Sequence, residues 1–133
     1  MMNDLQQETI FGQVVSKANN YTVGNNAGMG RHIVKTAELK AYERSFLKQC
    51  RIYSNRMING RFSLFVTVYE SSKRYDLDNA LKTILDCLQM AKAITNDNLC
   101  SKIVAEKRVD RQNPRIVFAI QEYEPRLFNI TQI

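Results

Sequence analysis

The residues best suited to chemistry lie in one short segment. Asp76 and Asp78 are two positions apart, Lys82 follows at a helical spacing, and Asp97 stands nineteen residues after Asp78. In an extended chain, residues two apart point the same way, so Asp76 and Asp78 can converge where a strand enters a helix. Neighbouring carboxylates repel, and a hard divalent cation relieves that repulsion while becoming a Lewis acid for a phosphodiester. Lys82 would neutralise charge that develops on phosphoryl oxygens.

The same residues also have ordinary structural explanations. An acidic pair at a helix start often serves as a cap, and Asp78 with Lys82 has the spacing of a salt bridge worth about 0.2–0.5 kcal/mol. Asp97 stands in a turn-like sequence, residues 95–98, from which it can swing toward a metal or simply face solvent. Asp86 extends the polar stripe by four residues without an assigned role. Spacing alone leaves both explanations open.

The elements that would position these residues follow from hydrophobic periodicity. Residues 62–69 alternate between strongly apolar and mixed side chains, which predicts a strand. Residues 78–92 carry leucines and isoleucine on one side, which predicts a helix directly after that strand. Thr36 is a suitable N-cap, and the periodicity after it predicts another helix over residues 37–51.

The remaining segments complete the predicted fold. Residues 6–15 are expected to form a first strand, and the Asn/Gly-rich residues 16–35 a long basic loop. Two strands, 100–109 and 115–123, are predicted to form a hairpin. Residues 125–133 are expected to be a C-terminal tail.

We therefore expect residues 1–133 to form a single domain. The predicted class is α/β (α+β): a small mixed β-sheet of about four strands with two helices packed on it, in the order β-α-β-α-β-β.

The charge balance favours a polyanionic partner. The chain has 19 Lys/Arg and 13 Asp/Glu, a net charge of +6. Residues 1–61 hold nine basic and four acidic residues, whereas residues 62–133 hold ten and nine. A basic half is typical of nucleic-acid binding, although a solvated charged surface explains the same count.

The cysteine and histidine counts restrict the metal and the compartment. Three cysteines without a CxxC motif and one histidine argue against a disulfide framework and a zinc site. The reduced, cytoplasmic interior of a cell is the expected location. Residues 1–8 are too polar for a signal peptide, and the longest apolar stretch, residues 62–69, is too short for a bilayer. A metal would need oxygen ligands, which favours Mg²⁺ or Mn²⁺.

The acidic segment resembles the central signature of RusA-type Holliday junction resolvases. The matching residues are spaced as Asp76-x-Asp78-Asn79-x-x-Lys82-x-x-x-Asp86-x-Leu88, with Asp97 at the distal position. A weaker similarity covers residues 18–21, residues 31–34 and the start of the helix that contains Ala41 and Tyr42. The predicted order of strands and helices resembles the family's small fold as well.

The resemblance implies a homodimer that binds four-way DNA junctions and nicks two opposed strands in recombination and repair. It implies Mg²⁺, with Mn²⁺ as a substitute, held by Asp76, Asp78 and Asp97, and Lys82 as a catalytic cation. The expected DNA-binding residues are Lys17, Tyr21, Arg31, Lys35, Lys73 and Arg74.

Two departures from the family pattern bear on activity. Asn96 stands where the family usually has a first distal aspartate, and Tyr75 stands where an arginine often precedes the first aspartate. The rival hypotheses are a non-catalytic binder of branched DNA, a nuclease for flaps or forks, and a plain interaction domain. Phe65, Tyr69 and Val117 are candidates for a dimer surface.

Overall fold

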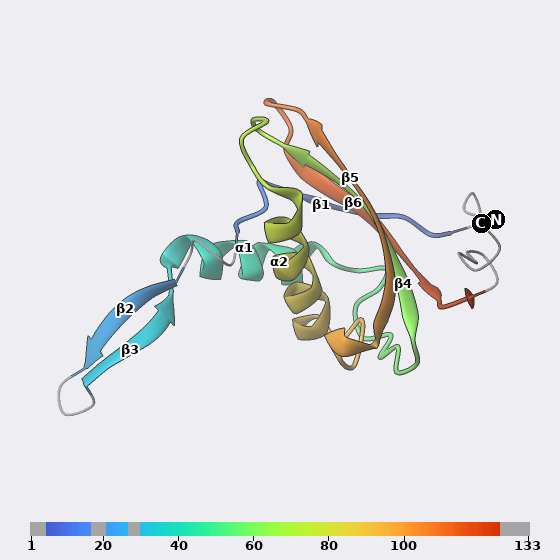
Figure 1. Ribbon diagram of the computed structural model, residues 1–133, viewed down its shortest axis with the longest axis horizontal. Helices are drawn as coiled ribbons and strands as arrows, with labels where there is room; N and C mark the ends of the chain where they lie inside the picture. The colour runs from blue at the N-terminus through green and yellow to red at the C-terminus, as the bar shows by residue number, and fades with distance from the viewer. Residues whose placement is uncertain (1–4, 17–20, 27–29, 126–133) are drawn as a thin grey trace.

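A four-stranded mixed sheet carries two helices on one face (Figure 1). The computed structural model describes residues 5–16, 21–26 and 30–125. Its elements, in chain order, are β1 (Glu8–Phe11), β2 (Tyr21–Asn26), β3 (Gly30–Lys35), α1 (Ala37–Gln49), β4 (Phe62–Glu70), α2 (Leu77–Met90), the short 3₁₀ helix η2 (Asp97–Leu99), β5 (Cys100–Val109) and β6 (Arg115–Glu122).

The sheet has the strand order β1-β6-β4-β5. β4 lies in the interior, antiparallel to β6 and parallel to β5, and α2 makes the crossover that a parallel pair requires. This arrangement confirms the predicted mixed sheet with two helices. It also sets the position of the acidic segment, because the chain passes through that segment as it leaves β4 and enters α2.

The predicted hairpin of residues 100–109 and 115–123 is wrong. β5 and β6 lie on opposite sides of β4 and make no ladder with each other. The connection across the end of β4 is held by the Asp110 N–H, which donates to the Glu70 carbonyl at 2.8 Å. β4 offers a hydrogen-bonding edge on each side, and β5 and β6 pair with one edge each.

The structure also differs from the predicted loop over residues 16–35. β2 and β3 form a separate antiparallel pair in which Tyr21 faces Lys35 and Asn26 faces Gly30. β-branched residues such as Val23 and Ile33 face each other in this ladder and favour extended structure. Gly24, Asn25, Asn26 and Gly30, which suggested a loop, instead take part in this ladder.

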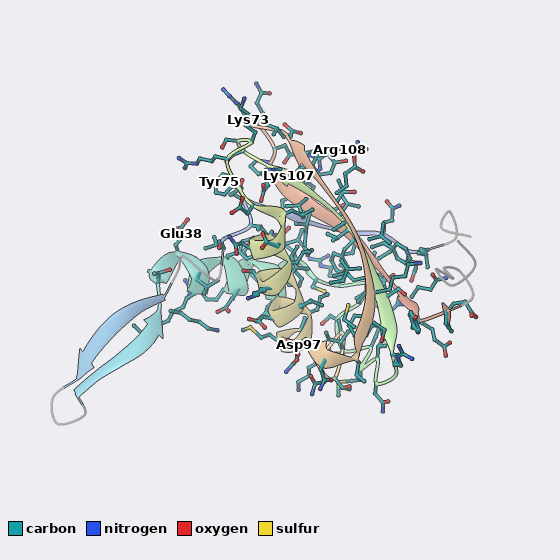
Figure 2. The ribbon with its side chains drawn as sticks, viewed as in Figure 1. Glu38, Lys73, Tyr75, Asp97, Lys107 and Arg108 are labelled. Atoms are coloured by element: carbon teal, nitrogen blue, oxygen red, sulfur yellow. The ribbon has the colours of Figure 1, made fainter. Side chains whose placement is uncertain are left out.

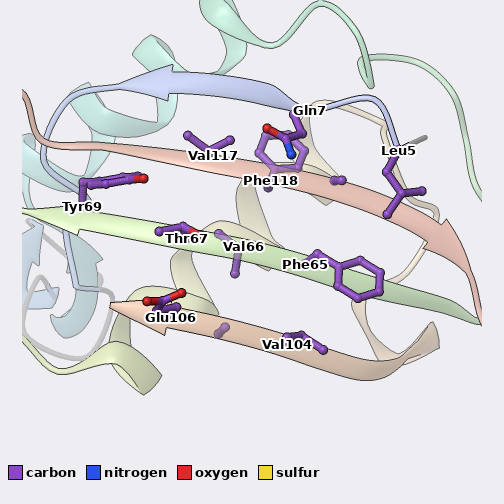
Figure 3. A pocket seen from close by; sticks show the side chains of 12 residues that line it. Leu5, Gln7, Phe65, Val66, Thr67, Tyr69, Val104, Glu106, Val117 and Phe118 are labelled. Atoms are coloured by element: carbon purple, nitrogen blue, oxygen red, sulfur yellow. The ribbon is translucent and has the colours of Figure 1, made fainter. Parts of the chain in front are cut away.

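Helices cover only one face of the sheet. Phe62, Leu64, Val66 and Val68 alternate along β4 and are buried under α1 and α2 together with Ile116 and Phe118 of β6. The opposite face is open and carries a hollow of about 660 Å³. Figure 3 shows the side chains that line it. Phe65, Tyr69 and Val117, the candidates for a dimer surface, line this hollow.

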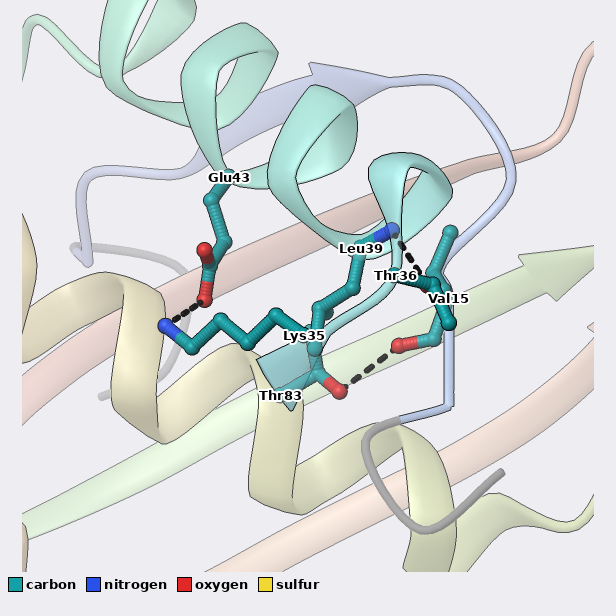
Figure 4. A network of polar contacts seen from close by, with 6 residues as sticks. All are labelled: Val15, Lys35, Thr36, Leu39, Glu43 and Thr83. Atoms are coloured by element: carbon teal, nitrogen blue, oxygen red, sulfur yellow. Dashed lines mark hydrogen bonds and ion pairs between the residues drawn. The ribbon is translucent and has the colours of Figure 1, made fainter. Parts of the chain in front are cut away.

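Polar contacts fix the helices (Figure 4). The Thr36 hydroxyl accepts a hydrogen bond from the Leu39 N–H at 3.2 Å, which confirms the predicted N-cap. On α2, the Thr83 hydroxyl donates to the Val15 carbonyl at 2.7 Å. This bond ties the segment after β1 to the helix that follows the acidic residues.

Glu8 is a buried carboxylate with a structural role. It accepts hydrogen bonds from the backbone N–H groups of Arg51, Ile52 and Tyr53 at 2.6, 2.9 and 3.0 Å. Burial by itself raises the pKa of Glu8, but these donors outweigh burial and hold the pKa below its ordinary value of 4.5. The carboxylate thus joins β1 to the loop after α1.

Across residues 5–16, 21–26 and 30–125, we find no helix with the length and apolar character needed to cross a membrane.

The Glu8→Gln substitution should lower the free energy of unfolding by about 1.5–3 kcal/mol at neutral pH, because an amide accepts these bonds less strongly. The lowered pKa means that the carboxylate stabilises the fold fully above pH 4.5 and less as the pH falls through that pKa. Urea unfolding at pH 7 and pH 3 measures this. The loss should shrink at pH 3, while the exposed Glu122→Gln control stays near wild type. An equal loss at both pH values would contradict the assignment.

Candidate active site

The site begins at Glu70, the last residue of β4. Its side chain is 1% exposed, and its Oε2 atom is buried without a hydrogen-bond partner. The prediction from sequence missed this residue, although a signal was present. Glu70 continues the two-residue spacing of the buried positions from Phe62 to Val68, so an acid occupies the next inward-facing place.

A lysine of β5 holds the segment between β4 and α2, residues 71–76, in place. Lys107 Nζ donates to the carbonyl oxygens of Lys73 at 3.2 Å and Tyr75 at 2.8 Å. At its start, the Ser71 N–H donates to Gln13 Oε1 at 2.7 Å. Lys107 was also missed, because its contact depends on the parallel pairing of β4 with β5 and has no local sequence signal. Figure 2 shows Lys107 beside Tyr75 and Lys73 at the upper end of the molecule.

Asp76 and Asp78 lie at the start of α2. Asp76 occupies the N-cap position, yet its side chain makes no capping hydrogen bond. The ordinary explanation of this residue as a side-chain cap therefore does not hold. Asp78 is exposed in the first turn, where a carboxylate interacts favourably with the helix dipole.

A cavity of about 310 Å³ opens at this junction. It is lined by Val14, Ser16, Glu70, Arg74, Tyr75, Asp76, Asn79 and Ala80. Two carboxylates, from Glu70 and Asp76, thus border the same space beside the Arg74 guanidinium. Asp78 does not line this cavity. It is the second residue of α2, two positions after Asp76.

Electrostatics couple the two carboxylates. Burial raises the pKa of Glu70 above its ordinary value of 4.5, the nearby charge of Lys107 lowers it, and the Asp76 carboxylate raises it. The net shift is upward, so negative charge at Glu70 is costly in the protein alone. A cation between the two acids would relieve both causes of the increase.

Lys82 is exposed one turn beyond Asp78 on α2. Within the part of the chain that the structure describes, no ion pair joins Lys82 to Asp78, so the salt bridge that their spacing allows is not formed. Asp86, a further turn along, is half-buried. The ammonium group of Lys82 therefore remains accessible to a phosphate.

Asp97 lies at the other end of α2. Its N–H donates to Gln89 Oε1 at 2.9 Å, and Figure 2 shows it below the helix while Tyr75 is above. The eleven helical steps from Asp78 to Gln89 span about 16 Å. Within one chain, the structure brings Asp76 close to Asp78 but does not bring Asp97 to either. Asn96 caps η2 by accepting from the Asn98 N–H at 3.0 Å, a role that an aspartate also performs.

The expected DNA-binding residues fall into two groups. Lys73 and Arg74 are exposed in the segment before Asp76, and Arg74 lies 5.3 Å from the centre of the Tyr75 ring. Lys35 instead pairs with Glu43 at 2.8 Å, which directs it back onto α1. The side chains of the other three expected DNA-binding residues are not described. Lys17 lies outside the described residues, and the structure describes only the backbone of Tyr21 in β2 and of Arg31 in β3.

The chain by itself supplies two carboxylates to the cavity. In the described ranges, no three His, Cys, Asp or Glu side chains gather closely enough to hold a metal ion. Magnesium, however, is commonly bound by one or two carboxylates together with water and substrate phosphates. The unpartnered Glu70 oxygen and the neighbouring Asp76 fit that donor set.

These features define a small α/β protein whose acids and exposed cations meet where a central strand enters a helix, an arrangement suited to a phosphodiester of nucleic acid. A family profile described as Endodeoxyribonuclease RusA matches residues 12–121. The chain therefore belongs to the RusA endodeoxyribonuclease family, which acts on Holliday junctions. No curated protein gives a significant match.

The Lys107→Met substitution should loosen the segment that presents Asp76, because two charge-assisted hydrogen bonds to its carbonyl groups are lost. We expect amide hydrogen exchange over residues 71–76 to accelerate by about tenfold, which corresponds to about 1.4 kcal/mol of local stability. Exchange measured by mass spectrometry tests this, with the exposed Lys48→Met as the control. Unchanged exchange in this segment would show that Lys107 does not hold it.

Proposed function

We propose that the protein is a magnesium-dependent endodeoxyribonuclease that resolves four-way DNA junctions by paired nicks, with Mn²⁺ as a substitute for Mg²⁺. The observation that carries this proposal is that Asp76 lines one cavity with Glu70, the last residue of β4, in a member of the RusA family. Asp78 follows in the first turn of α2, and exposed basic side chains lie on either side of this acidic pair. A divalent cation bound there would polarise the scissile phosphate and lower the pKa of a bound water.

The residues around this cation have separate roles. The Asp76 and Asp78 carboxylates hold the cation at the start of α2. Lys82, exposed and not paired with Asp78, approaches the phosphate and stabilises charge on its oxygens. Lys73 and Arg74 contact neighbouring phosphates and orient the strand without reading its sequence.

A homodimer suits a junction that has near two-fold symmetry, because a C2 pair presents two identical sites. A homodimer also explains how Asp97, the third proposed ligand, would reach the metal. The Asp97 N–H bonds to Gln89, which lies about 16 Å along α2 from Asp78 in the same chain, so we infer that Asp97 reaches a metal at Asp76 and Asp78 as the partner's residue. We therefore propose that each complete site contains Asp76 and Asp78 of one subunit and Asp97 of the other.

The Asp78→Asn substitution should reduce nicking of a labelled four-way junction by about 100-fold or more in Mg²⁺, since a ligand charge is lost. Junction affinity in gel-shift assays should stay the same or increase, because a charge that repels phosphate has gone. Glu122→Gln, at the far end of β6, is the matched exposed control. Near-normal nicking by Asp78→Asn would show that Asp78 is not a ligand. If the wild type cuts flaps or forks faster than four-way junctions, the proposed substrate is wrong.

Mixing two inactive variants tests the shared site. In a dimer of one Asp76→Asn and one Asp97→Asn subunit, a shared arrangement leaves one site with both substitutions and the other with none. Co-expression with different affinity tags isolates this mixed dimer. It should nick one strand of the junction, whereas each variant alone stays inactive. An inactive mixed dimer would place all three acids in one chain's site.

A further inference from the structure

Three glutamates are buried in the described structure: Glu8, Glu43 and Glu70, with exposed fractions of 4%, 7% and 1%. Glu8 accepts three backbone hydrogen bonds, and Glu43 pairs with Lys35 at 2.8 Å. Glu70, the most buried of the three, has an oxygen without any partner. Since burying an unpaired carboxylate is costly, this one position calls for a different explanation.

The Lys107 ammonium group does not supply the missing partner. Lys107 is close enough to affect Glu70 electrostatically, but its ammonium group donates to the carbonyl oxygens of Lys73 and Tyr75. The backbone N–H of Ser71, the next residue, donates to Gln13. These two donors are therefore committed elsewhere, and Glu70 lines a cavity that Asp76 also lines.

We propose that Glu70 is a ligand of the divalent cation, together with Asp76. This inference rests on the metal dependence in the proposed function and assigns that site a residue outside the Asp76, Asp78 and Asp97 set. The unpartnered oxygen receives its missing contact from the cation, and the cation lies between two acids that otherwise repel.

The two ligands have complementary positions. Glu70 ends the interior strand β4, and its backbone is held by pairing with Val109 of β5 and by the Asp110 N–H, which donates to its carbonyl. Asp76 starts α2, six residues later, on a segment held by Lys107. Glu70 therefore supplies a buried oxygen from a fixed backbone, while Asp76 is an exposed carboxylate beside it.

Binding of Mn²⁺ to the purified full-length protein, measured by electron paramagnetic resonance of the free ion, tests the inference without relying on cleavage. The Glu70→Gln substitution should weaken Mn²⁺ affinity by about tenfold or more. It should also raise the melting temperature in EDTA, because a buried unpaired charge is removed, and reduce the increase that Mn²⁺ gives to the wild type. Glu43→Gln, the matched buried control, should lower the melting temperature and leave Mn²⁺ affinity unchanged.

The outcomes separate this inference from the proposed function. Equal Mn²⁺ affinity in wild type and Glu70→Gln overturns the role of Glu70 alone. Absence of Mn²⁺ binding by the wild type overturns both. If Glu70→Gln does not fold, Glu70→Asp keeps the charge and withdraws the carboxylate by one methylene, and its Mn²⁺ affinity should fall while its fold is retained. Wild-type affinity in Glu70→Asp would again overturn the inference.

Discussion

The interior strand β4 is the constraint on which the site depends. Its buried residues from Phe62 to Val68 form the inner surface against which both helices pack, and it pairs with β5 on one side and β6 on the other. A strand paired on both edges and buried on one face has little freedom in register, since a one-residue slip would turn its apolar side chains outward. The end of β4 is therefore a fixed point, and Glu70 occupies it.

The parallel pairing of β4 and β5 carries that fixed position into the neighbouring segment. It aligns Val68 with Lys107, so the ammonium group reaches the carbonyl groups that lie just before Asp76. The same pairing requires a crossover, and α2 provides it. Acids at the strand end and the helix start meet because the chain must turn there. Ligand sites in open α/β sheets commonly form outside the carboxyl ends of strands for this reason.

The parts of the fold that sequence predicted are those that depend on local patterns. The alternation over residues 62–69 predicted β4, and the Thr36 cap with the periodicity after it predicted α1, because side-chain periodicity and capping act within a few residues. The pairing of β5 with β6 was predicted wrongly. A five-residue connection looks the same whether its strands pair or lie on either side of a third, and competition for β4 decides between them.

The residues of the candidate site also differ in whether a local sequence pattern identifies them. Asp76, Asp78 and Lys82 are recognisable from their spacing, and α2 presents them together. Glu70 has a signal only once its strand register is known, and Lys107 has one only once the strand pairing is known. The distance of Asp97 from Asp78 follows from α2 being one continuous helix, whereas sequence separation suggested a loop residue free to approach.

The comparison of Glu8 with Glu70 shows that this fold can accommodate a buried carboxylate when donors are provided. At Glu8, the chain after α1 turns three N–H groups toward the acid. At Glu70, the adjacent N–H and the nearest ammonium group bond elsewhere, and a valine would simply continue the apolar face of β4. Folding stability alone therefore does not account for an acid at this position. We infer that the Glu70 carboxylate is paired by a group that enters the cavity. A cation shared with Asp76 has the charge that the unpartnered Glu70 oxygen requires.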